Sequence, residues 1–252
     1  MNLLRAWTML FWLSYRRLLW SANTLMVLFP LAGCGLFLLR RRYDRMHNLA
    51  DAFQSFSNFL ILVFVSFVVP VCALAFGTAS IGGDREDRTL LFVLVRPIPR
   101  PLVLLAKFFA SLPLALGLVV GSFLVFCELA GKAGALAGQL YLPAVFYMTV
   151  AYVGLFHLFA VSLRHSTIVA LIYALFMEML LGNMPGIVKR VAVNYYGRSL
   201  MYAAGHGEGL GTPSWFEPIS PSTAAWVLAL FGAGGLALAL LVFQRREYRD
   251  LT

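Results

Sequence analysis

The densest group of ionisable side chains in the sequence lies at residues 84–88, which read Asp-Arg-Glu-Asp-Arg. An apolar stretch follows, and then a proline-rich turn at residues 97–101. Charges beside an apolar helical face are typical of a surface that binds another protein. A solvated connector between two membrane segments would have the same composition, so the residues alone favour neither reading. The candidate residues of this segment are Asp84, Arg85, Glu86, Asp87, Arg88, Thr89, Arg96, Pro97 and Arg100.

Three other ionisable residues, Glu178, His157 and Glu128, lie within or at the end of long apolar stretches. A carboxylate in hydrocarbon is costly unless it is neutral, paired or hydrated. Glu178 could therefore line a substrate path, carry a proton or pair across a subunit interface, and the alternative is a protonated side chain bonded to a neighbouring helix. Glu128 is expected near the membrane surface, with Lys132 one helical turn later. His157 stands alone in its segment, which favours an ordinary buried histidine over a ligand.

The sequence lacks the common motifs of catalysis and nucleotide binding. Gly131-Lys132 has neither the upstream glycine nor the following Ser or Thr of a phosphate-binding loop. There is no GxSxG or HExxH, and Cys34, Cys72 and Cys127 lie in apolar stretches without CxxC spacing. We therefore expect no catalytic residue, metal or cofactor in this chain, and an intramembrane enzyme that uses Glu178 and His157 is a weaker alternative.

The composition indicates a membrane protein. Of the 252 residues, 61% are hydrophobic and 12% are charged, whereas a soluble domain carries roughly a quarter charged residues. The net charge is +9, but the basic residues cluster between apolar stretches, which indicates a lipid bilayer and not nucleic acid. The predicted fold class is an all-α polytopic membrane helix bundle that forms one domain over residues 1–252.

The elements that would position these residues are six membrane spans of about 19 or more residues, each long enough for a hydrocarbon core of roughly 30 Å. An interfacial helix is expected at residues 1–18, a cytoplasmic loop at 82–101 and an external loop with short amphipathic helices at 185–222. Most Lys and Arg residues fall on the side of both termini, which favours cytoplasmic termini. Pro70 is expected to kink the second span. The spans are predicted at about residues 19–39, 56–81, 102–130, 140–163, 166–184 and 223–243.

The order of residue types between the second and third spans resembles a known family pattern. The matching residues are Asp84, Glu86, Thr89, Leu90, Val93, Leu94, Pro97, Arg100 and Lys107. With the interfacial helix, six spans and long last external loop, this order is similar to permease subunits of type-2 ABC exporters. Arg88 departs from the pattern, because the family usually has glycine there.

The resemblance implies a coupling helix within residues 84–100 that rests on a separate ATP-binding subunit, and ATP and Mg²⁺ would be bound there. Two copies of the chain, or one copy and a related permease subunit, would enclose a substrate path in the plasma (inner) membrane. A membrane scaffold that recruits a soluble partner through the same loop, without transport, is the alternative.

Overall fold

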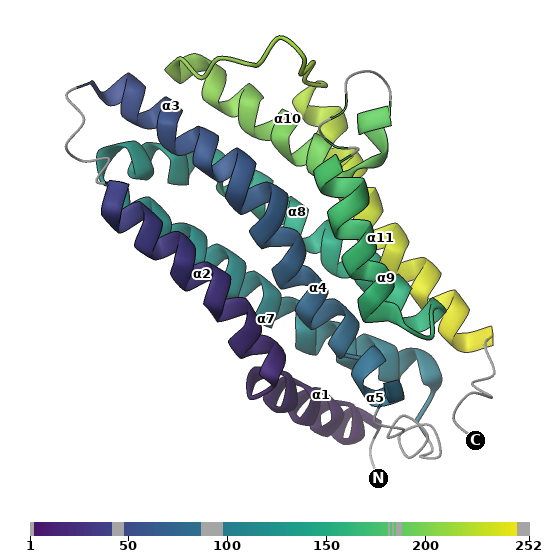
Figure 1. The fold of residues 1–252 in the computed structure, drawn as a ribbon. Helices are drawn as coiled ribbons and strands as arrows, with labels where there is room; N and C mark the ends of the chain where they lie inside the picture. The colour runs from purple at the N-terminus through teal and green to yellow at the C-terminus, as the bar shows by residue number, and fades with distance from the viewer. Residues whose placement is uncertain are drawn as a thin grey trace.

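In the computed structural model the chain folds into an elongated bundle of helices (Figure 1). The structure describes residues 3–41, 48–86, 98–180, 182, 184 and 188–245. The predicted all-α polytopic bundle is confirmed, although only five helices in this described part are long and apolar enough to cross a membrane. These are Ala22–Arg41, Leu49–Arg85, Arg100–Leu129, Lys132–Ser162 and Pro221–Arg245, and a shorter apolar helix covers Ser166–Glu178.

Helix α1 (Leu3–Leu19) covers the predicted interfacial segment and packs along α7. A tight turn at Ser21 leads directly into α2 (Ala22–Arg41), which runs off at an angle to α1 in Figure 1. The Ser21 and Thr24 hydroxyls both donate to the carbonyl oxygen of Leu18, each at 2.8 Å. These bonds satisfy a carbonyl that the end of a helix leaves open, and they hold α1 at the point where the first span begins.

The second span is one long helical stretch in which a π-helical segment lies between two α-helical segments. It comprises α3 (Leu49–Phe59), the π-helical segment η2 (Leu60–Val68) and α4 (Val69–Ala79), and it begins well before the predicted residue 56. The π-helical turns end just before Pro70, whose missing N–H and bulky ring disrupt the α-helical ladder. The expected irregularity at Pro70 is therefore present as a π-helical segment upstream of the proline.

Two long helices, α7 (Arg100–Leu129) and α8 (Lys132–Ser162), form a tight hairpin. Gly131 makes the turn with φ 64°, a backbone conformation that favours glycine. Helix α8 begins at Lys132 and not near residue 140 as predicted. It lies at the centre of the bundle, because α4, α7, α10 and α11 all pack against it.

The predicted fifth span is replaced by two shorter helical pieces. Helix α9 (Ser166–Tyr173) continues as the π-helical segment η3 (Ala174–Leu180). After the short turn η5 (Val188–Val191), helix α10 (Val193–Gly205) packs between α8 and α11. The sequence predicted an external loop with short amphipathic helices at residues 185–222. A helix is present at Val193–Gly205, but most of its side chains are buried inside the bundle.

The last helix, α11 (Pro221–Arg245), returns along α8 to the end of the bundle where the chain began. Figure 1 shows both chain ends, α1 and the short helix α5 (Gly82–Glu86) at this same end. The short helix α5, which follows the second span, therefore lies at the end of the bundle where α1 begins and α11 ends.

Candidate functional site

Asp84 on α5 is the centre of a buried ionic contact that joins three helices. Its carboxylate forms ion pairs with Arg17 of α1 and with Lys107 of α7. Only 6% of Asp84 and 2% of Lys107 are exposed, whereas half of the Arg17 side chain reaches solvent. The Lys107 ammonium also donates to the Ser80 carbonyl at 2.9 Å. Two cations thus neutralise one carboxylate at the start of the loop between the second and third spans.

Arg85, the next residue on α5, binds the carboxyl end of α8. Its guanidinium donates to the carbonyl oxygen of Leu163 at 2.7 Å and approaches that of Ala160 at 3.5 Å. A cation at a helix C-terminus is favourable, because the last carbonyls lack partners within the helix. We call Arg17, Asp84, Arg85 and Lys107 the α5 joint. Together they tie α5 to α1, α7 and α8.

These positions revise the expectation that Asp84 and Arg85 face a partner protein, since both side chains are buried against neighbouring helices. Glu86 is the last residue of α5, and Arg100 is an exposed residue at the start of α7. The other five predicted contact residues lie outside the described residues. They are Asp87, Arg88, Thr89, Arg96 and Pro97.

His157 extends the polar interior beyond the α5 joint. Its Nε2 lies 2.9 Å from the Ser80 hydroxyl and 3.2 Å from the Ser111 hydroxyl. Its Nδ1 lies 2.8 Å from the Val153 carbonyl oxygen, which only a protonated Nδ1 can bond. The residue is fully buried. This arrangement agrees with an ordinary, hydrogen-bonded core histidine.

Glu178 lies in η3, and its carboxylate caps the first turn of α10. It accepts hydrogen bonds from the backbone N–H groups of Val193 at 3.1 Å and Asn194 at 2.8 Å. The Tyr152 hydroxyl of α8 donates to the same carboxylate at 2.8 Å. The positive end of a helix favours a hydrogen-bond acceptor, and three donors from α8 and α10 converge on the Glu178 side chain. All these partners belong to the same chain, which argues against the cross-subunit pairing considered for Glu178.

The amide of Asn194 extends this contact to the second span. Its Nδ2 donates to the Ser66 hydroxyl of η2 at 2.9 Å, and that hydroxyl donates to the Ile61 carbonyl at 2.7 Å. The Glu178 network therefore joins η3, α8, α10 and η2. Sequence reading identified Glu178 but missed Asn194, which is distant in sequence and was assigned to a loop.

Glu128, the third predicted polar residue, is exposed near the outer end of α7. Within the described residues it forms no ion pair with Lys132, so the expected turn-to-turn pair is not seen. A search of the same residues found no group of three His, Cys, Asp or Glu side chains that could hold a metal ion.

An aromatic cluster fastens the external loop to α10. The ring of Phe216 lies 5.5 Å from the Lys189 ammonium and 5.7 Å from the Arg198 guanidinium. The Tyr195 hydroxyl donates to the Glu217 carbonyl oxygen at 2.8 Å. Cation–π contacts of desolvated charges are among the stronger ones. Lys189, Arg198 and Phe216 are separated along the chain, so no local sequence pattern predicts these contacts.

The described residues form a bundle of apolar helices with a buried ionic joint, which is the architecture of a polytopic membrane protein. The sequence model of the ABC-2 family transporter protein matches residues 15–202, which is most of the chain, and the chain belongs to this family. It is a permease subunit of an ABC transporter and is not itself the catalytic subunit. The match includes the α5 joint and Glu178. No curated protein matches the chain.

Proposed function

We propose that this permease belongs to an exporter, and that a separate ATP-binding subunit docks on the loop at residues 84–100 and drives it. The observation that supports this most is the position of the α5 joint. It lies where that loop begins, at the same end of the bundle as both termini (Figure 1). In this proposal the termini are cytoplasmic, the membrane is the inner (plasma) membrane, and ATP and Mg²⁺ bind to the partner.

The α5 joint gives the proposal a mechanical basis. A force on the loop acts first on α5, and α5 is tied by Asp84 to α1 and α7 and by Arg85 to α8. Charged contacts between buried groups are costly to break one at a time. A displacement of α5 therefore moves these helices together, and the ATP-binding subunit needs different contacts with the loop in its two states to drive the change.

A second copy of the chain, or a related permease subunit, would complete the substrate path. Helix α4 packs against both α2 and α9, so these helices form one face of the bundle (Figure 1). Large apolar side chains are exposed on α2, η2, α9 and η3, and a second subunit would cover some of them. They include Leu25, Met26 and Phe29 of α2, Leu62 and Val63 of η2, and Ile168, Ile172 and Leu175 of α9 and η3.

Co-purification with the cognate ATP-binding subunit tests the docking role. The double variant Glu86→Ala/Asp87→Ala should weaken co-purification and leave membrane insertion intact. Glu208→Ala is the matched control, because Glu208 is exposed near the far end of α10. Equal recovery of the ATP-binding subunit with wild type and the double variant would contradict docking on this loop.

Asp84 requires a separate test because its side chain is buried. Asp84→Asn should leave a complex that still binds and hydrolyses ATP, but in which ATP no longer changes the accessibility of the permease to labelling reagents. The membrane scaffold would be favoured if the wild-type permease binds the ATP-binding subunit but ATP does not change the accessibility of the permease to labelling reagents.

A further inference from the structure

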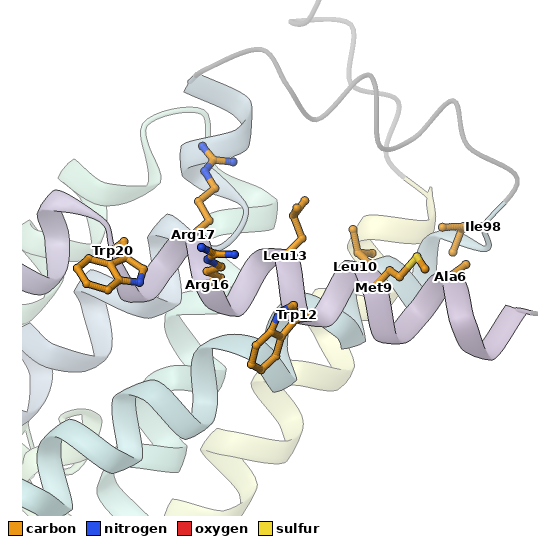
Figure 2. Close-up of a pocket in the computed structure, with 9 residues that line it drawn as sticks. All are labelled: Ala6, Met9, Leu10, Trp12, Leu13, Arg16, Arg17, Trp20 and Ile98. Carbon is orange, nitrogen blue, oxygen red and sulfur yellow. The ribbon is translucent and has the colours of Figure 1, made fainter.

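An apolar groove of about 1020 Å³ runs along α1, with Ile98 at its edge (Figure 2). Its size is at the upper end of the roughly 300–1,000 Å³ that small-molecule sites enclose. Figure 2 shows Leu13 and Arg17 projecting from one side of α1 and Trp12 from the other. Met9 is 68% exposed, Leu13 69% and Trp20 82%. Exposed apolar surface of this extent indicates a binding partner or a membrane.

The position of α1 decides between these two. The turn at Ser21 joins α1 directly to the first span, so α1 lies at the membrane surface. Trp12 and Trp20 fit this position, because tryptophan is enriched where membrane meets water. An amphipathic helix in this position buries its apolar side chains at the boundary between headgroups and acyl chains. A lipid therefore suits the groove better than a soluble protein does.

The positive charge at one end of the groove indicates that the bound lipid is anionic. Arg17 is engaged by Asp84, whereas Arg16 has no carboxylate partner among the described residues. Arg16 is exposed at one end of the groove, one turn from Trp12. The cytoplasmic leaflet carries anionic lipids that attract basic residues near its surface. A phosphate bound by Arg16 would place an acyl chain along Met9 and Leu13.

We propose that this groove binds an anionic phospholipid, with its headgroup at Arg16 and an acyl chain against Met9, Leu13 and Ile98. The site goes beyond the transport function, and it is a property of the permease alone. The bound lipid covers the apolar side chains along α1 and fixes the depth of this helix at the membrane surface.

The test uses the purified permease without its partner, reconstituted in vesicles of three parts phosphatidylcholine to one part phosphatidylglycerol. After extraction, native mass spectrometry counts the retained lipids of each kind. Wild type should retain phosphatidylglycerol preferentially, and Arg16→Gln should reduce this preference about fivefold, the effect of one basic residue near a membrane. Leu13→Asp, which places a negative charge in the groove, should reduce retention of both lipids.

Arg245→Gln is the matched control, because it removes one exposed charge at the same end of the bundle but outside the groove. It should retain lipid as the wild type does. The same preference in wild type and Arg16→Gln would overturn the proposal. An equal loss in Arg16→Gln and Arg245→Gln would do so too, because it would indicate diffuse attraction to the membrane. A separate co-purification of the same variants with the ATP-binding subunit completes the test: variants that keep the lipid but lose that subunit would make the groove a protein-docking surface instead.

Discussion

The carboxylate of Glu178 accepts a 2.8 Å hydrogen bond from the backbone N–H of Asn194, the second residue of α10. This contact joins η3, which contains Glu178, to α10. It gives a buried acid a structural role at the start of a buried helix, and the first prediction tests that role.

Glu178→Gln should destabilise the permease and loosen the first turn of α10. A glutamine offers one carbonyl oxygen where the carboxylate offers two, so at least one backbone N–H loses its acceptor. An unsatisfied buried donor costs about 1–3 kcal/mol. The loss should appear as a lower melting temperature in detergent and as faster amide hydrogen exchange at Val193 and Asn194.

Tyr152→Phe is the comparison for that variant. It removes one donor but leaves both backbone bonds to Glu178, so it should cost only about 1 kcal/mol. If the two variants have the same stability as the wild type, the capping role is wrong, and a role in transport regains weight.

Asp84→Asn should cost more than any change to Arg17. The variant leaves the buried Lys107 without its counter-charge, and removing one partner of a buried pair typically costs about 3–5 kcal/mol. Arg17→Gln should stay within about 1 kcal/mol, because half of that side chain is in solvent. Thermal unfolding of both variants gives the comparison.

A double variant separates the charge effect from a loss of packing at Asp84. Asp84→Asn combined with Lys107→Met should recover part of the lost stability, since the unpaired cation is gone. No recovery would show that the ion pair is not what Asp84 contributes.

Gly154→Ala should force α8 and α11 apart. An added Cβ would lie 2.3 Å from the carbonyl oxygen of Gly232, and a backbone atom cannot move aside as a side chain can. Overpacking of this kind typically costs about 1–3 kcal/mol. Gly234→Ala is the matched control on α11, where the nearest atom is 3.9 Å away in a leucine side chain. Melting temperatures should fall for Gly154→Ala and stay unchanged for Gly234→Ala.

Phe216→Ala should release the external loop from α10, because the ring that lies between Lys189 and Arg198 is lost. The loop at residues 206–220 should then be cut faster by an added protease. Trp226→Ala, at a residue that is 77% exposed on α11, should not change the cleavage rate. Equal cleavage in both variants would mean that the aromatic cluster does not hold the loop.

A membrane-impermeant thiol reagent tests the orientation. Gly207→Cys should be labelled from outside intact cells, whereas His165→Cys should be labelled only after the cells are opened. Both positions are exposed, and the wild type gives the background from Cys34, Cys72 and Cys127. Labelling in the reverse order would place the α5 joint outside the cell and would end the proposal of an ATP-binding partner there.

Hydropathy predicted the all-α bundle and most of its spans, because long apolar segments are a strong local signal. It placed the start of the fourth span near residue 140, whereas α8 begins at Lys132. It expected short amphipathic helices in an external loop at residues 185–222, whereas α10 has Asn194 and Arg198 buried inside the bundle. Their burial depends on Glu178, Tyr152 and the aromatic cluster, and no local pattern reveals such distant partners.

In the candidate site too, the sequence indicated unusual residues but not their distant partners. The charged cluster and Glu178 stood out in the sequence as unusual residue types at unusual places. That Asp84 and Arg85 face inward could not be predicted, because their partners are far from them in the sequence. The cations that pair with Asp84 are Arg17 and Lys107, and they lie on helices that come together only in the folded chain.

The close contact of Gly154 with Gly232 and Gly235 has a consequence for how motion would cross the membrane. Backbone of α8 meets backbone of α11 there, with the Val150 side chain beside Gly232. Helices α8 and α11 should therefore travel as one rigid rod. That rod carries the carbonyls that hold Arg85 near one membrane surface and the hydroxyl that holds Glu178 deeper in the bundle. A push delivered at α5 would arrive at α10 through the tilting of this rod, without a relay of switching side chains.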